Sequence, residues 1–242
     1  MMVFKYRAAL EDVQKATKLD PTFVKGYLRE AKCHLLFGDT TSAARSLNSV
    51  KTLDPNNPSL AQEKKTLDLL ERHIKEFHRN CEKKEYRTAL YNIKKANEIA
   101  TESQSLKLLK AECLVFLGKN SDAQEIVNDL LRMEPRNADA IYIRGLALYY
   151  TDNVDKAFAH FQQVLVFSPD HEKAKKIYKT AKKLSAEKQK GNDALKVNKV
   201  EEAVNIYTKA LEIDPLNALT NAKLYFNRSI AYLKVCPTLS LF

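Results

Sequence analysis

Side chains that can donate hydrogen bonds to an acidic partner recur at helical spacing in this chain. Lys188 and Asn192 are four residues apart, as are Lys25 and Arg29, so the members of each pair would share one face of a helix. Asn227 stands further along, in the run LYFNRSIAYL. Packing gives no reason for polar side chains on these faces. The net charge of +10 suggests acidic partners, but Lys-rich helix faces that keep helices in solution would also explain it. These five residues are therefore our candidates for binding chemistry.

Six alanines and five prolines define a repeat that would position these donors. The alanines are separated by 34, 46, 34, 34 and 46 residues, and five of them are followed by a proline twelve residues later. This pattern is typical of the tetratricopeptide repeat, a helix pair whose first helix lines the inner face of a solenoid. The alanines are Ala9, Ala43, Ala89, Ala123, Ala157 and Ala203, and the prolines are Pro21, Pro55, Pro135, Pro169 and Pro215, with Thr101 in the one vacant place.

The repeat predicts an all-α, right-handed solenoid of helix-turn-helix units. The two 46-residue intervals each hold twelve extra residues of helix-compatible sequence, and twelve helical residues add about 18 Å. We therefore expect two elongated helices, about 58–83 and 171–198. They divide the chain into three blocks, which are the C-terminal part of a first block (1–57), a middle block of three repeats (58–171) and a truncated third block (172–242).

The candidate donors resemble the dicarboxylate clamp of tetratricopeptide cochaperones, which bind the acidic C-terminal tails of heat-shock chaperones of the 70-kDa and 90-kDa classes. In that family, K-x-x-x-N on one repeat, N-R-[AS] on the next and K-x-x-x-R on the third grip the terminal carboxylate and the side chain of the last Asp. The resemblance implies that Lys188, Asn192 and Asn227 belong to one clamp and that Lys25 and Arg29 belong to another. Charge-assisted hydrogen bonds, which are the strong kind, make such a clamp physically sound.

Longer runs resemble a branch of this family in which two clamp modules flank a middle block and a J domain ends the chain. Neither a His-Pro-Asp triplet nor a J domain occurs here, so we expect no stimulation of a chaperone ATPase by that route. The clamp with Lys188, Asn192 and Asn227 lacks two of five donors, and losing two bonds of about 1.5–3 kcal/mol each would weaken tail binding by about a hundredfold or more. The clamp with only Lys25 and Arg29 would be weaker still. The runs are LLKAECLVFLGKNSDAQEIVNDLLRMEPRNADAIYIRGLALYY, SPDHEKA and IDPLNALTNAKLYFNRS.

The middle block predicts no clamp, because none of its five equivalent residues is the expected donor. They are Ile74, His78, Leu109, Asp139 and Ile143.

Other classes of function lack their signatures. The sequence has no Ser-His-Asp order, paired-carboxylate pattern, phosphate loop or G-x-G-x-x-G, so we expect no enzyme, no cofactor and no small-molecule substrate. The five histidines and four cysteines lack metal-ligand spacing, so we expect free thiols and no metal site. With no signal-peptide run and no apolar stretch of 18 residues, we expect a cytoplasmic protein, with the nucleus as a second compartment, and no membrane partner.

The interpretation that we adopt is a cochaperone-type adaptor that holds chaperones or their client proteins. One alternative is a general protein-interaction scaffold. A second is a nucleic-acid-associated protein that uses the Lys-rich segment 171–190. Against the second, the apolar residues of that segment fall on one face, as in an amphipathic surface helix.

Overall fold

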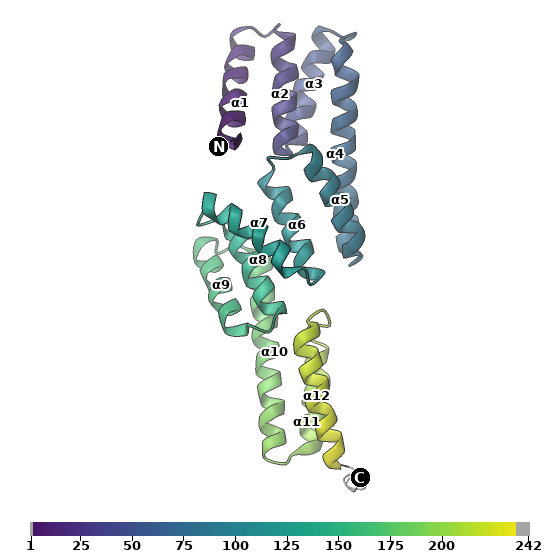
Figure 1. Cartoon of the computed structure of the whole chain (residues 1–242), viewed down its shortest axis with the longest axis vertical. Helices are drawn as coiled ribbons and strands as arrows, with labels where there is room; N and C mark the ends of the chain where they lie inside the picture. Colours follow the sequence, from purple (N-terminus) through teal and green to yellow (C-terminus); the bar gives the residue numbers. More distant parts are fainter. Residues whose placement is uncertain (1, 236–242) are drawn as a thin grey trace. The chain divides into compact units, whose positions relative to one another are not determined.

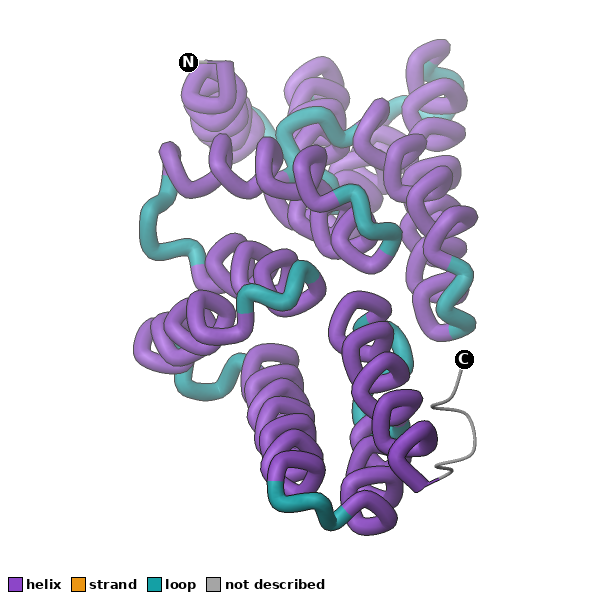
Figure 2. Tube along the Cα trace, turned by 60° about the horizontal axis from the view of Figure 1, so that its bottom comes forward, coloured by secondary structure: helices purple, strands orange, loops and turns teal. Residues whose placement is uncertain are grey.

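The computed structural model describes residues 2–235, and within them it contains helices and loops but no strands (Figure 2). The chain divides into two compact units, Met1–Leu117 and Gly118–Phe242. The helices of the first unit are α1 (Met2–Leu19), α2 (Val24–Phe37), α3 (Thr40–Leu53), α4 (Pro58–Glu82), α5 (Tyr86–Ile99) and α6 (Gln104–Phe116). Those of the second unit are α7 (Asn120–Met133), α8 (Ala138–Tyr150), α9 (Val154–Phe167), α10 (Glu172–Lys196), α11 (Val200–Leu211) and α12 (Ala218–Val235) (Figure 1).

Consecutive helices pack as antiparallel pairs inside each unit. In the first unit α2 packs against α3 and α4 against α5, and in the second α8 packs against α9 and α10 against α11 (Figure 1). Adjacent pairs are joined through contacts of α3 with α4 and of α9 with α10. The predicted all-α tetratricopeptide architecture is therefore confirmed.

The two elongated helices are also confirmed, because α4 and α10 are each 25 residues long. Each begins at a capped end. The side chain of Asn57 accepts a hydrogen bond from the amide of Ser59 (3.0 Å), and Nδ1 of His171 accepts one from the amide of Ala174 (3.1 Å). Such side-chain caps satisfy backbone donors that a helix start leaves unpaired.

The periodic small residues lie where two helices approach closely. Five of the six repeat alanines are fully buried, whereas Ala9 is exposed because no described helix covers its face of α1. At Gly191 a Cβ atom would lie 2.6 Å from the ring of Tyr207, and at Gly145 it would lie 2.9 Å from the ring of Phe161. Any side chain at these two glycines would therefore push the paired helices apart.

One residue at positive φ ends the first helix of each repeat. The five such residues keep the spacing of the alanines, and their left-handed backbone suits Gly, Asn and Asp better than other residues. They are Gly38 (φ 77°), Lys84 (60°), Gly118 (72°), Asp152 (60°) and Asn198 (63°). In the repeat formed by α8 and α9, the residue at this turn is Asp152, which brings a carboxylate.

The boundary between the two units falls inside the predicted middle block of residues 58–171, because α6 belongs to the first unit and α7 to the second. The division into blocks at 1–57, 58–171 and 172–242 stays a prediction.

Candidate functional site

Two of the candidate amides meet where α10 and α12 come together. Nδ2 of Asn227 donates to Oδ1 of Asn192 (2.9 Å), and the hydroxyl of Tyr207 on α11 donates to the same oxygen (2.8 Å). With two donors on its oxygen, Asn192 turns its amide nitrogen, and both N–H groups, away from these partners. Burial raises the pKa of the Tyr207 phenol, so this hydroxyl stays protonated at neutral pH. The arrangement presents amide donors in a fixed orientation.

The close approach of α11 to α10 holds the Tyr207 hydroxyl in place. The ring of Tyr207 is fully buried against Gly191, the residue immediately before Asn192. The preceding repeat has the same packing, with Phe161 against Gly145, but a phenylalanine there brings no hydroxyl. Gly191, which allows α11 to pack closely on α10, therefore also fixes the position of the Tyr207 hydroxyl.

Lys188, one helical turn before Asn192, pairs with a carboxylate of the chain itself. Its Nζ lies 3.6 Å from Oδ1 of Asp152, and the hydroxyl of Thr220 donates to that same oxygen (2.8 Å). Nζ of Lys223 on α12 pairs with the other oxygen, Oδ2. Burial alone would raise the pKa of Asp152, but the bonds from Lys223 and Thr220 and the charge of Lys188 hold it below its usual range. Asp152 is therefore a carboxylate at neutral pH.

The turn that carries Asp152 is fixed against the start of α12 by a buried polar cluster. The hydroxyl of Tyr149 donates to Oδ2 of Asp214 (2.9 Å), and Nδ2 of Asn217 donates to the carbonyl of Tyr149 (3.4 Å). Oδ1 of Asn217 also accepts from the amide of Thr220 (3.2 Å), which caps α12. A buried hydrogen bond to a charged group contributes about 1.5–3 kcal/mol, so the cluster holds the two segments firmly together.

The other two candidates, Lys25 and Arg29, lie in the first unit on α2. Both side chains are exposed, and neither forms an ion pair with a described residue. They line a pocket of about 450 Å³ whose apolar wall includes Val13 and Ala16 of α1 and Leu28 of α2. The five predicted donors thus form two groups, each within its own unit, and their role in binding stays a prediction.

We call Lys188, Asn192, Asn227 and the residues that contact them, directly or through Asp152, the second-unit site. Four of its residues were not predicted from the sequence: Tyr207, Asp152, Thr220 and Lys223. A signal for Lys223 existed, because Lys223 and Asn227 repeat the K-x-x-x-N spacing of Lys188 and Asn192. Asp152 gave a weaker signal, because it lies 34 residues after Gly118 and is the one acidic residue among the five turn residues at this repeat position.

The middle-block residue Asp139 also has an internal partner. Nε2 of His171, at the start of α10, lies 3.1 Å from its carboxylate. Ile143, one turn further along α8, is buried. Neither residue offers a donor to an acidic ligand.

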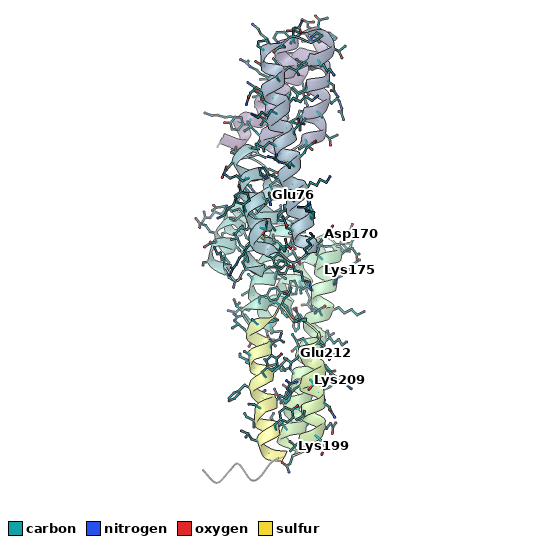
Figure 3. The ribbon with its side chains drawn as sticks, turned by 90° about the vertical axis from the view of Figure 1, so that its right-hand side faces the viewer. Glu76, Asp170, Lys175, Lys199, Lys209 and Glu212 are labelled. Atoms are coloured by element: carbon teal, nitrogen blue, oxygen red, sulfur yellow. The ribbon has the colours of Figure 1, made fainter. Side chains whose placement is uncertain are left out.

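The Lys-rich segment 171–190 forms most of α10, and some of its lysines pair with carboxylates. Lys175 pairs with Glu172 (2.9 Å) and Lys190 with Glu187 (2.7 Å). Figure 3 places Lys175 near the start of α10, Lys199 at the turn into α11 and Lys209 along α11. The apolar side of α10 is covered, with Ala174, Ala181 and Leu184 buried, as expected for an amphipathic surface helix.

Within residues 2–235, no group of three His, Cys, Asp or Glu side chains could hold a metal ion. None of the described helices combines the length and the apolar character needed to cross a bilayer.

Cys113 is a buried free thiol that donates to the carbonyl of Tyr86 (3.2 Å), and burial raises its pKa to about 12. Cys236 lies outside the described residues.

Comparison with known proteins agrees with the repeat architecture. A family model described as tetratricopeptide repeat matches residues 108–172, and another with the same description matches residues 190–215. DnaJ homolog subfamily C member 7 of Homo sapiens is 44% identical over 228 residues, which is 94% of this chain and 46% of that protein. Its Dictyostelium discoideum homolog is 30% identical over 92% of this chain and 41% of that protein. The chain therefore spans about half the length of the curated relatives it matches.

Among solved structures, the P58(IPK) TPR domain aligns with a TM-score of 0.54 and 19% identity. The alignment covers 94% of this chain and 64% of that one. At this identity the likeness shows the fold alone.

Proposed function

This chain belongs to the tetratricopeptide-repeat proteins, with DnaJ homolog subfamily C member 7 among its relatives, and from that premise we propose that it is a non-enzymatic cochaperone that binds acidic C-terminal tails. One observation carries the proposal. Asn192 and Asn227, on the first helices of two successive repeats, are hydrogen-bonded to each other at 2.9 Å, and Lys188 lies one turn away. Three donors of the kind that hold carboxylates are thus gathered in one place.

A C-terminal aspartate presents two carboxylates, on its side chain and on its main chain. The amides of Asn192 and Asn227 donate hydrogen bonds without the desolvation cost of a buried charge, and Lys188 supplies the charge-assisted bond. The resemblance to clamp-bearing cochaperones favours tails of heat-shock chaperones of the 70-kDa and 90-kDa classes, with client proteins as further cargo. The protein would then act in the compartment of those chaperones, the cytoplasm, and also in the nucleus.

We propose a second site for an acidic segment at Lys25 and Arg29. Neither cation forms an ion pair with any residue between 2 and 235, and the adjoining pocket can take an apolar side chain that precedes the acidic residue. The two sites are proposed independently, because they lie in different units.

The test is fluorescence anisotropy with a labelled peptide that ends in Glu-Glu-Val-Asp, compared with the same peptide amidated at its C-terminus. We expect amidation to weaken binding by about tenfold or more, because it removes one carboxylate that accepts charge-assisted bonds. Lys188→Ala, Asn192→Ala and Asn227→Ala should each weaken binding of the free peptide and leave the amidated peptide less affected.

The matched control is Lys190→Ala, which removes the same charge from an exposed position two residues further along the helix. Equal binding of the free and amidated peptides would contradict the proposal. So would a loss of affinity in the Lys190→Ala variant as large as that in Lys188→Ala, since both results would indicate non-specific attraction to a basic surface.

A further inference from the structure

We infer that Asp152 is an internal ligand of the second-unit site: its carboxylate occupies Lys188 and Lys223, and an acidic peptide must displace it before it can engage both lysines. This inference rests on the proposed function and concerns how the same site is controlled. It also assigns Lys223 to the site as a second cation.

The contacts at Asp152 are those that a bound carboxylate would make. Lys188 lies 3.6 Å from one oxygen, Thr220 donates to that oxygen at 2.8 Å, and Lys223 pairs with the other oxygen. The donors come from α10 and α12, whereas Asp152 comes from the turn between α8 and α9 of the preceding repeat. A residue of one repeat thus sits on cations of the next two first helices, as a peptide side chain would.

The chain has the means to hold this internal carboxylate in place. Asp152 has only 12% of its side chain exposed, and its turn is fixed to the start of α12 through Tyr149 and Asn217. A tethered group competes at a high effective concentration, so it can occupy the lysines ahead of a free peptide. Lys223 keeps 60% of its side chain exposed and stays within reach of an incoming ligand.

The charges of Lys188, Lys223 and Asp152 together set how strongly the site attracts an acidic ligand. Lys188 and Lys223 contribute two positive charges and Asp152 removes one, so the site offers a dicarboxylate a single uncompensated cation. Displacing Asp152 would release the second cation. The site would then present two K-x-x-x-N pairs, Lys188 with Asn192 and Lys223 with Asn227, to the two carboxylates of a terminal aspartate.

The experiment uses Asp152→Asn in the full chain with the free and amidated peptides. Asparagine keeps an oxygen that accepts from Thr220, and it suits the left-handed backbone, since Asn198 holds the same position in the next repeat. We expect the free peptide to bind about tenfold more tightly, because a charge-assisted bond becomes available to it. Adding Lys223→Ala to Asp152→Asn should remove that gain, and the matched control Asp155→Asn, which neutralises an exposed carboxylate three residues away, should show none.

The outcomes separate this inference from the proposed function. If the unmutated chain prefers the free peptide but Asp152→Asn binds it equally or less well, Asp152 orients Lys188 and is not a competitor, and the inference is wrong while the proposed function stands. An equal gain with Asp155→Asn would also overturn it. If neither the unmutated chain nor Asp152→Asn distinguishes free from amidated peptide, the proposed function itself fails.

A second measurement covers the case in which Asp152→Asn does not fold. The side-chain carboxyl carbon of Asp152 can be followed by NMR in the unmutated chain during a titration with the free peptide. Displacement predicts that its chemical shift and its pKa move toward those of a solvated aspartate. A signal unchanged at saturation would show that Asp152 stays on its lysines, and the inference would fall.

Discussion

The direction in which a single amide points decides whether the second-unit site can bind an anion. An asparagine presents an oxygen on one side and two N–H donors on the other, so a flipped Asn192 would repel a carboxylate. Tyr207 and Asn227 both donate to Oδ1 of Asn192, and this fixes the orientation that favours an acidic ligand. The phenol is therefore a positioning group, although it need not touch the ligand.

Tyr207→Phe tests this role. Phenylalanine fits the space, since Phe161 holds the equivalent buried position in the preceding repeat. We expect a loss of about 1 kcal/mol in the free energy of unfolding, typical of one hydrogen bond, and a several-fold loss of affinity for the free-carboxylate peptide. Urea denaturation and anisotropy titrations measure the two effects.

Tyr178→Phe is the control for Tyr207→Phe, because it removes a hydroxyl that accepts a hydrogen bond from Gln162 and has no contact with the site. Unchanged peptide affinity in Tyr207→Phe, at any stability, would show that Asn192 keeps its orientation without the phenol.

The lysine partners of Asp152 should make part of the stability depend on pH. The folded-state pKa of Asp152 lies below its unfolded value, so its contribution is fully present above the unfolded pKa and is lost as pH falls through the folded pKa. With an unfolded pKa near 4, we expect the stability difference between the unmutated chain and Asp152→Asn to be constant around neutral pH and to shrink from about pH 4 downwards. Urea denaturation of both proteins at pH 7 and at successively lower pH measures it, and a difference that grows with acid would contradict the assignment.

At the scale of helices, the sequence predicted the helix lengths and the buried positions, because both depend on the spacing of residues along the chain. The interval of 46 residues predicted the elongated helices α4 and α10, and the periodic alanines predicted buried contacts, because both follow from helical geometry within one repeat. Asn192 and Asn227 could be linked because they lie 35 residues apart, close to one repeat.

The pairing of Asp152 with Lys223 was not predictable in this way. It joins residues 71 positions apart and depends on how the end of α8 meets the start of α12. Periodicity shows which residues share a face of one helix, but it does not give the distance between faces of different helices. In the buried cluster that brings those ends together, Asp214 and Asn217 stand at repeat positions, but the bond from Tyr149 spans 65 residues, and the repeat does not predict it.

Gly191→Ala tests the link between helix packing and the site. A methyl group there would meet the ring of Tyr207 at 2.6 Å, and α11 would have to shift away from α10. We expect overpacking to cost about 1–3 kcal/mol, more than the better helix propensity of alanine returns, and to weaken peptide binding by moving the Tyr207 hydroxyl. Lys190→Ala, one residue earlier and exposed, is the control for propensity. A stabilised Gly191→Ala protein with normal affinity would show that this close approach is not needed.

Over the whole molecule, stability should be distributed rather than concentrated in one core. Within each unit most helix contacts are between neighbours in sequence, as in other repeat proteins, where stability is approximately a sum over repeats and their interfaces. Each compact unit also contains its own group of candidate donors. A local defect should therefore affect mainly the site in its own unit.

A pair of matched substitutions tests this distribution. Ala43 in the first unit and Ala203 in the second are both fully buried at the same repeat position, so Ala43→Leu and Ala203→Leu should each overpack one helix pair, at a cost of about 1–3 kcal/mol. Hydrogen exchange followed by mass spectrometry should show lost protection mainly in residues 2–117 for Ala43→Leu and mainly in residues 118–235 for Ala203→Leu. Only Ala203→Leu should weaken a peptide bound through Lys188, Asn192 and Asn227. Uniform loss of protection along the chain in both variants would mean that the repeats unfold as a single cooperative unit, and that the two candidate sites cannot be destabilised separately.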